Sequence, residues 1–324
     1  MSASTLILTV TRQCNLRCSY CPTAKDGWPS LSADQALQAL RLFSARGGGD
    51  VKLFGGEPLL VPDVVEAVFR EARDIGNIRR LYLSTNGLGL DADWLERVRL
   101  TPKAILTVSM DGRPEDHRRL RRALPEVADT YSHLMDLLPA LLDTPRLVVT
   151  QTIAPATARD AAENFAHLRG LGFTRFNLLP GYYLPWRDAQ LADLARGFDA
   201  IRAQIEALWA ADGYLYLRNL YTWAPTPFFN TGMVVDADGS IHPSNIGLSG
   251  KLDHLRAQTA AGTLDDPPSP AALAAKAEQV NGLLEQALEP RVLASTRAVD
   301  AELTRLCQGL YPAWARWRRR RAAA

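Results

Sequence analysis

The sequence contains little cysteine, little net charge and no long apolar run. Only four of its 324 residues are cysteines, and 37 lysines and arginines nearly balance 35 aspartates and glutamates, which leaves a formal net charge of +2. A chain this close to neutral gives no general sign of nucleic-acid binding. One basic cluster, RWRRRR, stands at residues 316–321. We expect it to be a solvated end of the chain, with a docking site for an acidic partner as the alternative.

No apolar run approaches the ~18 residues that a membrane-spanning helix needs, so we expect no membrane association. Residues 1–5 lack the basic and apolar regions of a secretory signal. We therefore expect a cytoplasmic protein, in which thiols stay reduced. Three of the four cysteines lie within residues 14–21, and this crowding indicates a metal or cluster site rather than a disulfide framework.

Strand-like and helix-like segments alternate through the first two thirds of the chain. Short buried strands are predicted at 5–11, 51–54, 80–85, 104–109, 146–153 and 174–179. Helices are predicted at 31–45, with Ser32 as N-cap, and at 64–75, 93–99, 118–142, 158–171 and 188–211. Such alternation is typical of a parallel sheet with right-handed crossovers. Six units over this length predict an α/β fold, a partial (β/α)6 TIM-like barrel, with its chemistry at the carboxyl ends of the strands.

The pattern changes after residue 211. A strand at 214–219 and a hairpin within 233–242, turning at Asp238-Gly239, are followed by a linker at 264–270 rich in proline and aspartate. Helices are predicted at 271–288 and 291–319, the second interrupted at Pro312. We therefore expect three parts: a barrel at 1–213, a hairpin extension at 214–263 and C-terminal helices at 264–324.

The cysteine motif is Cys14-Asn-Leu-Arg-Cys18-Ser-Tyr-Cys21. Three thiolates on one short loop can bind three irons of a [4Fe-4S] cubane and leave the fourth iron open for a ligand. A structural zinc site is the first alternative, but zinc usually takes four ligands from two places, and no fourth Cys or His lies near this loop. Three uninvolved thiols are the second alternative.

Cys-x3-Cys-x2-Cys with an aromatic residue before the third cysteine resembles the signature of the radical S-adenosylmethionine (SAM) superfamily. The resemblance implies that Cys14, Cys18 and Cys21 hold one [4Fe-4S] cluster and that Tyr20 packs near the SAM adenine. The open iron then chelates SAM, and an electron from a reductant such as flavodoxin or ferredoxin cleaves it. The 5′-deoxyadenosyl radical that results abstracts a hydrogen atom from the substrate, chemistry that belongs to the cofactor.

Further motifs follow predicted strands. Gly55, Gly56 and Glu57 close the second strand, and the resemblance assigns this Gly-Gly-Glu-Pro segment to the SAM amino group; a turn with an incidental Glu is the alternative. Weaker candidates for SAM binding are Asn86, Ser109, Asp111, Gln151 and Leu179. Asn86 could instead simply shape a turn, and for Gln151 and Leu179 the alternative is ordinary packing at the end of a strand.

The hairpin at 234–242 resembles the start of the cysteine-rich SPASM extension, or of its short form, twitch. Where that extension has cysteines for an auxiliary cluster, this chain has Asn230, Ser244 and Asn245. We therefore expect a twitch-like remnant without a cluster. Cys307 alone cannot hold a second one. A thiol that donates hydrogen to a radical is one interpretation of Cys307, and an inert helix thiol is the other.

We expect a radical SAM enzyme that acts on a ribosomally made peptide, as in RiPP maturation. A small molecule in natural-product or cofactor biosynthesis is the alternative substrate, and a non-catalytic metal- or cluster-binding protein is the alternative of another class. Because the first predicted strand begins at residue 5, we expect no separate N-terminal domain for a leader peptide. Arg187, Arg218 and His242 are candidate polar contacts. Aromatic residues that either line a pocket or pack the hairpin lie within 182–186, 221–223 and 228–229.

Overall fold

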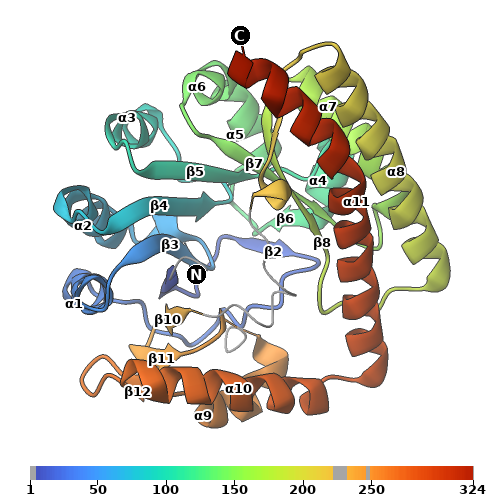
Figure 1. Cartoon of the computed structure of the whole chain (residues 1–324). Coiled ribbons are helices and arrows are strands. Elements are labelled where there is room, and N and C mark those ends of the chain that lie inside the picture. Colours follow the sequence, from blue (N-terminus) through green and yellow to red (C-terminus); the bar gives the residue numbers. More distant parts are fainter. Residues whose placement is uncertain (1–4, 222–231, 246–248, 324) are drawn as a thin grey trace. The chain divides into compact units, whose positions relative to one another are not determined.

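The computed structural model describes residues 5–221, 232–245 and 249–323 (Figure 1). The chain divides into two compact units. The first consists of Met1–Val108, Ala123–Leu147 and Ala224–Ala287, and the second of Ser109–Arg122, Val148–Trp223 and Leu288–Ala324. Asn230, Trp223, Phe228 and Phe229 lie outside the described residues. No helix in the described ranges is long and apolar enough to cross a membrane.

The first unit contains a mostly parallel sheet with helices on one side of it (Figure 1). Its parallel strands are β1 (Thr5–Thr11), β3 (Gly49–Gly55), β4 (Ile78–Thr85) and β5 (Ala104–Ser109). The helices between them are α1 (Ala33–Ala45), α2 (Pro62–Asp74) and α3 (Ala92–Leu100). Ser32 caps α1 as predicted, because its side chain accepts the Gln35 N–H while Gln35 returns a bond to the Ser32 backbone.

The register of the parallel strands shows that one face of the sheet is apolar and that the opposite face carries both polar and apolar side chains. Side chains alternate along each strand, so partners in a parallel register lie on the same face. The row on one face consists of four fully buried leucines, Leu8, Leu53, Leu83 and Leu106. The next row, on the opposite face, is Thr9, Phe54, Ser84 and Thr107. Helices α1 and α2 pack on β1 and β4, so the leucines form the core between sheet and helices.

The C-terminal hairpin is part of the same sheet. Strand β10 (Met233–Val235) pairs in parallel with β1, and β11 (Ser240–His242) pairs antiparallel with β10 and with β12 (Gly262–Thr263). The turn lies at Asp238-Gly239, as predicted, and Gly239 has a φ of +81°, which favours glycine. Helix α9 (Arg256–Thr259) and helix α10 (Pro270–Ala287) follow.

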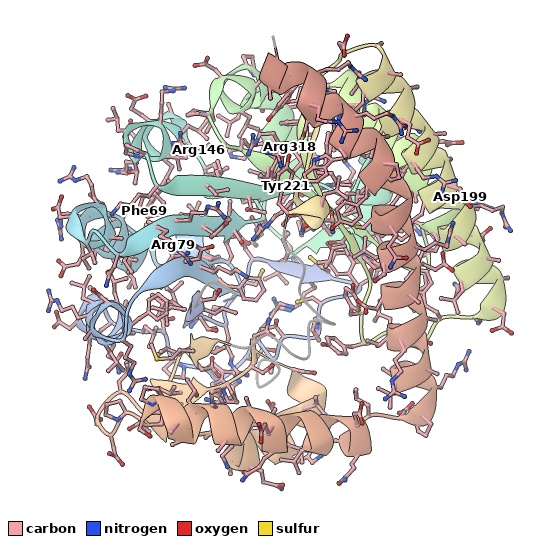
Figure 2. All side chains as sticks on the ribbon, in the orientation of Figure 1. Phe69, Arg79, Arg146, Asp199, Tyr221 and Arg318 are labelled. Carbon is pink, nitrogen blue, oxygen red and sulfur yellow. The ribbon has the colours of Figure 1, made fainter. Side chains whose placement is uncertain are left out.

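The second unit contains the parallel strands β7 (Val148–Ile153), β8 (Arg175–Pro180) and β9 (Tyr216–Leu217). Helices α7 (Ala161–Gly170), α8 (Asp188–Ala210) and α11 (Pro290–Ala323) belong to it, and α11 runs beside α8 (Figure 1). Asp199 of α8 accepts a bond of 2.7 Å from Arg305 of α11. Figure 2 shows Arg318 near Tyr221, with 6.0 Å from the guanidinium carbon to the ring centre.

Two helix predictions were wrong in detail. Helix α11 continues through Pro312, although a proline inside a helix costs about 3 kcal/mol. Packing on both sides of the proline offsets this cost: Leu306 and Leu310 are buried before it, and Trp317 stacks on Trp209 after it. The predicted helix at 118–142 is instead α4 (Pro114–Leu120), an extended segment Arg121–Ala123, α5 (Thr130–Asp136) and α6 (Leu138–Asp143).

Parallel strands alternate with helices in both units, which confirms the α/β fold. Within the described residues the order of the strands runs from β12 to β9 without closing. The predicted strand at 214–219 is shorter, because β9 gives way to a 3-10 turn at Arg218–Leu220. The domain boundaries expected at residues 213 and 263 stay predictions.

His242 in β11 makes stability of the first unit depend on pH. Burial, and secondarily the charge of Arg256, lowers the pKa of His242 to about 4, against ~6.5 in an unfolded chain. Between these values the unfolded chain binds a proton that the folded chain does not. We therefore expect about 3 kcal/mol of stability, complete above pH ~6.5, to be lost as the pH falls through about 4.

The His242→Gln variant tests this dependence by urea unfolding at a series of pH values between 4 and 7. Its stability should change less over this range than that of the wild type. The exposed His254, changed to Gln, is the matched control. If the free energy of unfolding changed equally with pH in His242→Gln and in the wild type, His242 would not be the source of the pH dependence. Asp238, whose pKa is lowered to about 2 by its bonds to Ser240 and Arg256 against the effect of burial, titrates below this window.

Candidate active site

The cysteine loop, residues 12–24, leaves the carboxyl end of β1 and contains the short strand β2 (Leu16–Cys18). Cys14, Cys18 and Cys21 are half-buried and form no disulfide. The backbone N–H of Cys21 donates to the Cys18 carbonyl at 3.1 Å, so the last two cysteines flank a tight turn. The loop therefore holds three thiols close in sequence and accessible to a ligand.

Polar groups approach the sulfur of Cys14. The Leu16 N–H lies 3.4 Å from Cys14 Sγ, and the Asn86 amide nitrogen lies 4.0 Å from it. Burial raises the pKa of the Cys14 thiol, and the Leu16 N–H opposes this rise. N–H donors stabilise a thiolate, which is the form that binds iron.

The end of β3 packs directly on the cysteine loop through backbone bonds. The Gly56 N–H donates to the Thr11 carbonyl and the Glu57 N–H to the Gln13 carbonyl, both at 2.8 Å. A Cβ on Gly56 would lie 2.0 Å from Gln13 O, and one on Gly55, whose φ is +145°, would lie 2.0 Å from Thr11 O. The two glycines are therefore required by the approach of two backbone segments.

We expect Gly56→Ala to displace the cysteine loop, because the obstructing atoms belong to the backbone. Overpacking of this kind costs about 1–3 kcal/mol. The thermal midpoint should fall, and so should the iron bound after anaerobic reconstitution. Gly76→Ala is the matched control, because a Cβ there meets nothing within 4 Å. Wild-type iron content in Gly56→Ala would show that the close approach does not position the cysteines.

Glu57 connects β3, β4 and the cysteine loop. Its carboxylate is buried, with 1% of the residue exposed. One oxygen accepts from the Leu59 N–H at 3.0 Å and from the Thr85 hydroxyl at 2.7 Å, and the other accepts from the Asn86 N–H at 2.7 Å. The Asn86 side chain in turn donates to Asn15 Oδ1 at 2.8 Å, within the cysteine motif. The structure thus brings Cys14, Glu57 and Asn86 together.

Four predicted residues lie in the second unit. Asp111 is buried, and its carboxylate pairs with Arg121 at 2.9 Å and accepts the Thr152 N–H at 3.1 Å. Gln151 is buried and donates to the Ala161 carbonyl at the start of α7. Ser109 is half-buried at the end of β5, and Leu179 is half-buried near the end of β8. Asp111 and Gln151 therefore hold parts of the second unit together.

Three residues that complete these networks were not among the candidates from the sequence, namely Arg12, Asn15 and Arg121. Asn15 lies inside the cysteine motif, so its position was the one available signal. The candidate contact His242 is buried beside Ser240 Oγ, 2.8 Å from its Nε2, and Thr259. The aromatic residue Trp186 is buried and donates from its ring to the Gly181 carbonyl, so it packs within the second unit.

The donor set of the cysteine loop fits a cubane cluster. Within 5–221, 232–245 and 249–323, no three His, Cys, Asp or Glu side chains gather as a ligand set for one ion. Three reachable thiols on one loop, with an N–H directed at Cys14 Sγ, match the three-thiolate requirement of a cluster with one open iron.

Comparison with known proteins identifies the family. The sequence model of the Radical SAM superfamily matches residues 8–195, which is more than half of the chain. The chain belongs to the radical SAM superfamily. As a radical SAM protein it is an enzyme, and its family implies SAM and a [4Fe-4S] cluster as cofactors.

Curated relatives of this radical SAM enzyme match over short stretches. The GTP 3′,8-cyclase of Lactiplantibacillus plantarum is 43% identical over 89 residues, 26% of each chain. The molybdenum cofactor biosynthesis protein 1 of Bos taurus is 34% identical over 114 residues, 33% of this chain and 18% of that protein. The chain thus spans about a fifth to a quarter of the length of these relatives.

Solved structures of radical SAM proteins share the fold. Native anSMEcpe with bound AdoMet has a TM-score of 0.70 at 17% identity, covering 85% of this chain and 82% of that one. SuiB of Streptococcus suis, bound to its precursor peptide SuiA, has a TM-score of 0.59 at 14% identity, covering 76% and 61%. This similarity confirms the partial-barrel fold. At 17% and 14% identity it shows nothing about the substrate or the reaction.

Proposed function

We propose that this radical SAM enzyme cleaves SAM reductively at a single [4Fe-4S] cluster bound by Cys14, Cys18 and Cys21. The observation that carries the proposal is the connection of the three-cysteine loop to Glu57 and Asn86. When bound, the cluster and SAM supply a 5′-deoxyadenosyl radical that removes a hydrogen atom from the substrate. The electron comes from a one-electron reductant such as flavodoxin or ferredoxin.

Residues of the first unit are suited to bind SAM beside the cysteine loop. Glu57 places a buried negative charge close to Cys14, where it attracts the SAM ammonium group. Gly55 and Gly56 keep side chains away from the strand end, and Tyr20 offers a half-buried ring on the loop itself. The roles of Ser109, Asp111, Gln151 and Leu179 toward SAM stay predictions from the family resemblance.

We infer one cluster rather than two. Of the four cysteines, three belong to the motif and Cys307 lies on α11 of the second unit. A [4Fe-4S] cluster needs several thiolates. At the hairpin, Ser244 is buried and Asn245 is half-buried, and neither side chain offers the thiolates that a second cluster needs. With a single cluster, no auxiliary cluster of this chain would accept the electron that a substrate radical loses on oxidation.

We propose a small molecule of cofactor or natural-product biosynthesis as the substrate class. The curated sequence relatives are named for GTP cyclisation and molybdenum cofactor biosynthesis. They favour this alternative over the ribosomally made peptide that we expected first. The peptide named in the anSMEcpe and SuiB structures belongs to relatives that share the fold alone.

Anaerobic reconstitution tests the enzyme assignment. The protein should bind about four irons per chain and convert SAM to 5′-deoxyadenosine with dithionite as reductant. Stoichiometric zinc without cleavage would support a metal-binding protein instead. For the substrate class, a small-molecule filtrate of cell extract should accelerate 5′-deoxyadenosine formation, and the effect should survive treatment of the filtrate with protease. Loss of the effect after protease treatment would restore the peptide hypothesis.

Cys307 stays a predicted hydrogen donor with a defined test. Burial raises the pKa of its thiol to about 11, so the sulfur keeps its proton at neutral pH, and Sγ lies 3.8 Å from the Asn219 carbonyl. If the thiol quenches a product radical in deuterated water, Cys307→Ala should abolish deuterium uptake while 5′-deoxyadenosine still forms. Unchanged product with unchanged deuterium content removes Cys307 from the mechanism.

A further inference from the structure

A buried arginine connects the start of the cysteine loop to the C-terminal hairpin. Arg12 stands two residues before Cys14 and is 0% exposed. Its Nε donates to Asp236 Oδ1 at 3.1 Å, and its Nη2 pairs with Asp236 Oδ2, so the guanidinium makes a two-pronged bond. The guanidinium carbon also lies 3.6 Å from the centre of the Trp28 ring. Arg12 and Asp236 are 224 positions apart in sequence.

A second arginine, at the start of helix α9, reinforces this contact. Arg256 pairs with both Asp236 and Asp238 and donates to Ser240 Oγ at 2.7 Å. Its guanidinium carbon lies 4.5 Å from the centre of the same Trp28 ring. Asp236 thus receives two guanidinium groups, and these bonds lower the pKa of its carboxyl although burial alone would raise it. A third carboxylate, that of the exposed Asp253, lies 3.8 Å from Arg12 Nη1.

The far end of the cysteine loop contacts the same C-terminal region. The Gly250 N–H donates to the Pro22 carbonyl at 3.0 Å, one residue after Cys21. Thr23 and Ser249 form an antiparallel bridge. A Cβ on Gly250 would lie 3.2 Å from the Ala24 Cβ, so the two backbones are in close contact. Both ends of the loop are therefore bonded to one segment, consisting of the described residues 232–245 and 249–264, which we call the hairpin segment.

We propose that the hairpin segment clamps the cysteine loop at both ends, and that Arg12 and Asp236 are positioning residues that hold the loop in the conformation that receives the cluster. Three ligands on one loop bind a cluster well only when the loop is ordered beforehand. A buried ion pair is a costly way to gain stability alone, but it favours one arrangement, because separating Arg12 from Asp236 would leave a buried charge without its partner. The proposal builds on the proposed function for the cluster, whereas the clamp itself can be measured without iron.

Hydrogen–deuterium exchange of the cluster-free full chain tests the clamp. In Asp236→Asn, peptides covering residues 13–24 should exchange roughly a hundredfold faster, as expected when a buried pair loses one charge. Peptides of α2, residues 62–74, should keep the wild-type rate. Arg41→Gln, which breaks an exposed ion pair of the same unit with Glu71, is the matched control and should leave both regions unchanged.

Conservative variants keep the test valid if Asp236→Asn does not fold. Arg12→Lys keeps the charge but loses the two-pronged bond and the planar stack on Trp28. It should show faster exchange over residues 13–24 and less iron after reconstitution, with an unchanged α2. Asp236→Glu keeps a carboxylate that can accept from both Arg12 nitrogens. Residues 13–24 should therefore exchange more slowly in Asp236→Glu than in Asp236→Asn, although faster than in the wild type. Wild-type exchange over residues 13–24 in Arg12→Lys overturns the clamp.

The two proposals fail in different ways. If the wild-type protein binds no iron while the exchange results are as expected, the cluster assignment fails and the clamp stands. If the wild type binds iron and cleaves SAM while Arg12→Lys and Asp236→Asn keep wild-type exchange and iron content, the clamp fails and the cluster assignment stands.

Discussion

Cys18→Ala is expected to abolish both iron binding and SAM cleavage. Cys14, Cys18 and Cys21 lie on one loop, and no other cysteine belongs to the first unit. A cubane that loses one of three thiolates has two open irons and is lost to solvent. We expect iron to fall from about four atoms per chain to a trace, and 5′-deoxyadenosine to fall below detection. Both are measured after anaerobic reconstitution, by iron analysis and by chromatography.

Cys307→Ala provides the matched control for this experiment, because it removes a half-buried thiol of the second unit. It should retain full iron content and form 5′-deoxyadenosine. A circular dichroism spectrum of Cys18→Ala should match that of the wild type, since Cys18 is only half-buried and the substitution removes a single sulfur atom. Full iron content in Cys18→Ala would refute the three-cysteine cluster.

Local spacing predicted much of the fold and part of the site. The strand at 104–109 has the predicted bounds, and that at 5–11 does as well. Both are short apolar runs bounded by turn residues, a signal that needs only neighbouring positions. The cysteine motif and Glu57 were likewise expected at the ends of strands, and they follow β1 and β3, whereas their roles stay predictions.

Long-range pairing and side-chain direction could not be predicted in this way. The bond between Arg12 and Asp236 depends on β10 pairing with β1, which no local pattern encodes. Gln151 lies in a strand buried on both faces, so alternation does not reveal that its side chain is directed at α7. Pro312 was expected to interrupt a helix, because the stacking of Trp317 on Trp209 is a tertiary contact.

Loss of the Glu57 carboxylate is expected to destabilise the protein strongly. Its buried carboxylate satisfies two backbone N–H groups, those of Leu59 and Asn86, and the hydroxyl of Thr85. Each buried donor that loses its acceptor costs about 1–3 kcal/mol, and bonds to a charged acceptor are at the upper end. Because Asn86 contacts Asn15 and Cys14, the damage extends into the cysteine loop.

We therefore expect Glu57→Ala to lose about 3–5 kcal/mol of stability and to lower the thermal midpoint by roughly 6–15 °C. Glu57→Gln keeps one oxygen acceptor but places its NH2 group against a hydrogen-bond donor. It should therefore lose about half as much stability as Glu57→Ala. Glu66→Ala, an exposed glutamate of α2, should change the midpoint by less than about 1 °C. If Glu57→Ala instead melts like the wild type and fails only to cleave SAM, Glu57 acts on the cofactor alone and the network through Asn86 does not hold the cysteine loop.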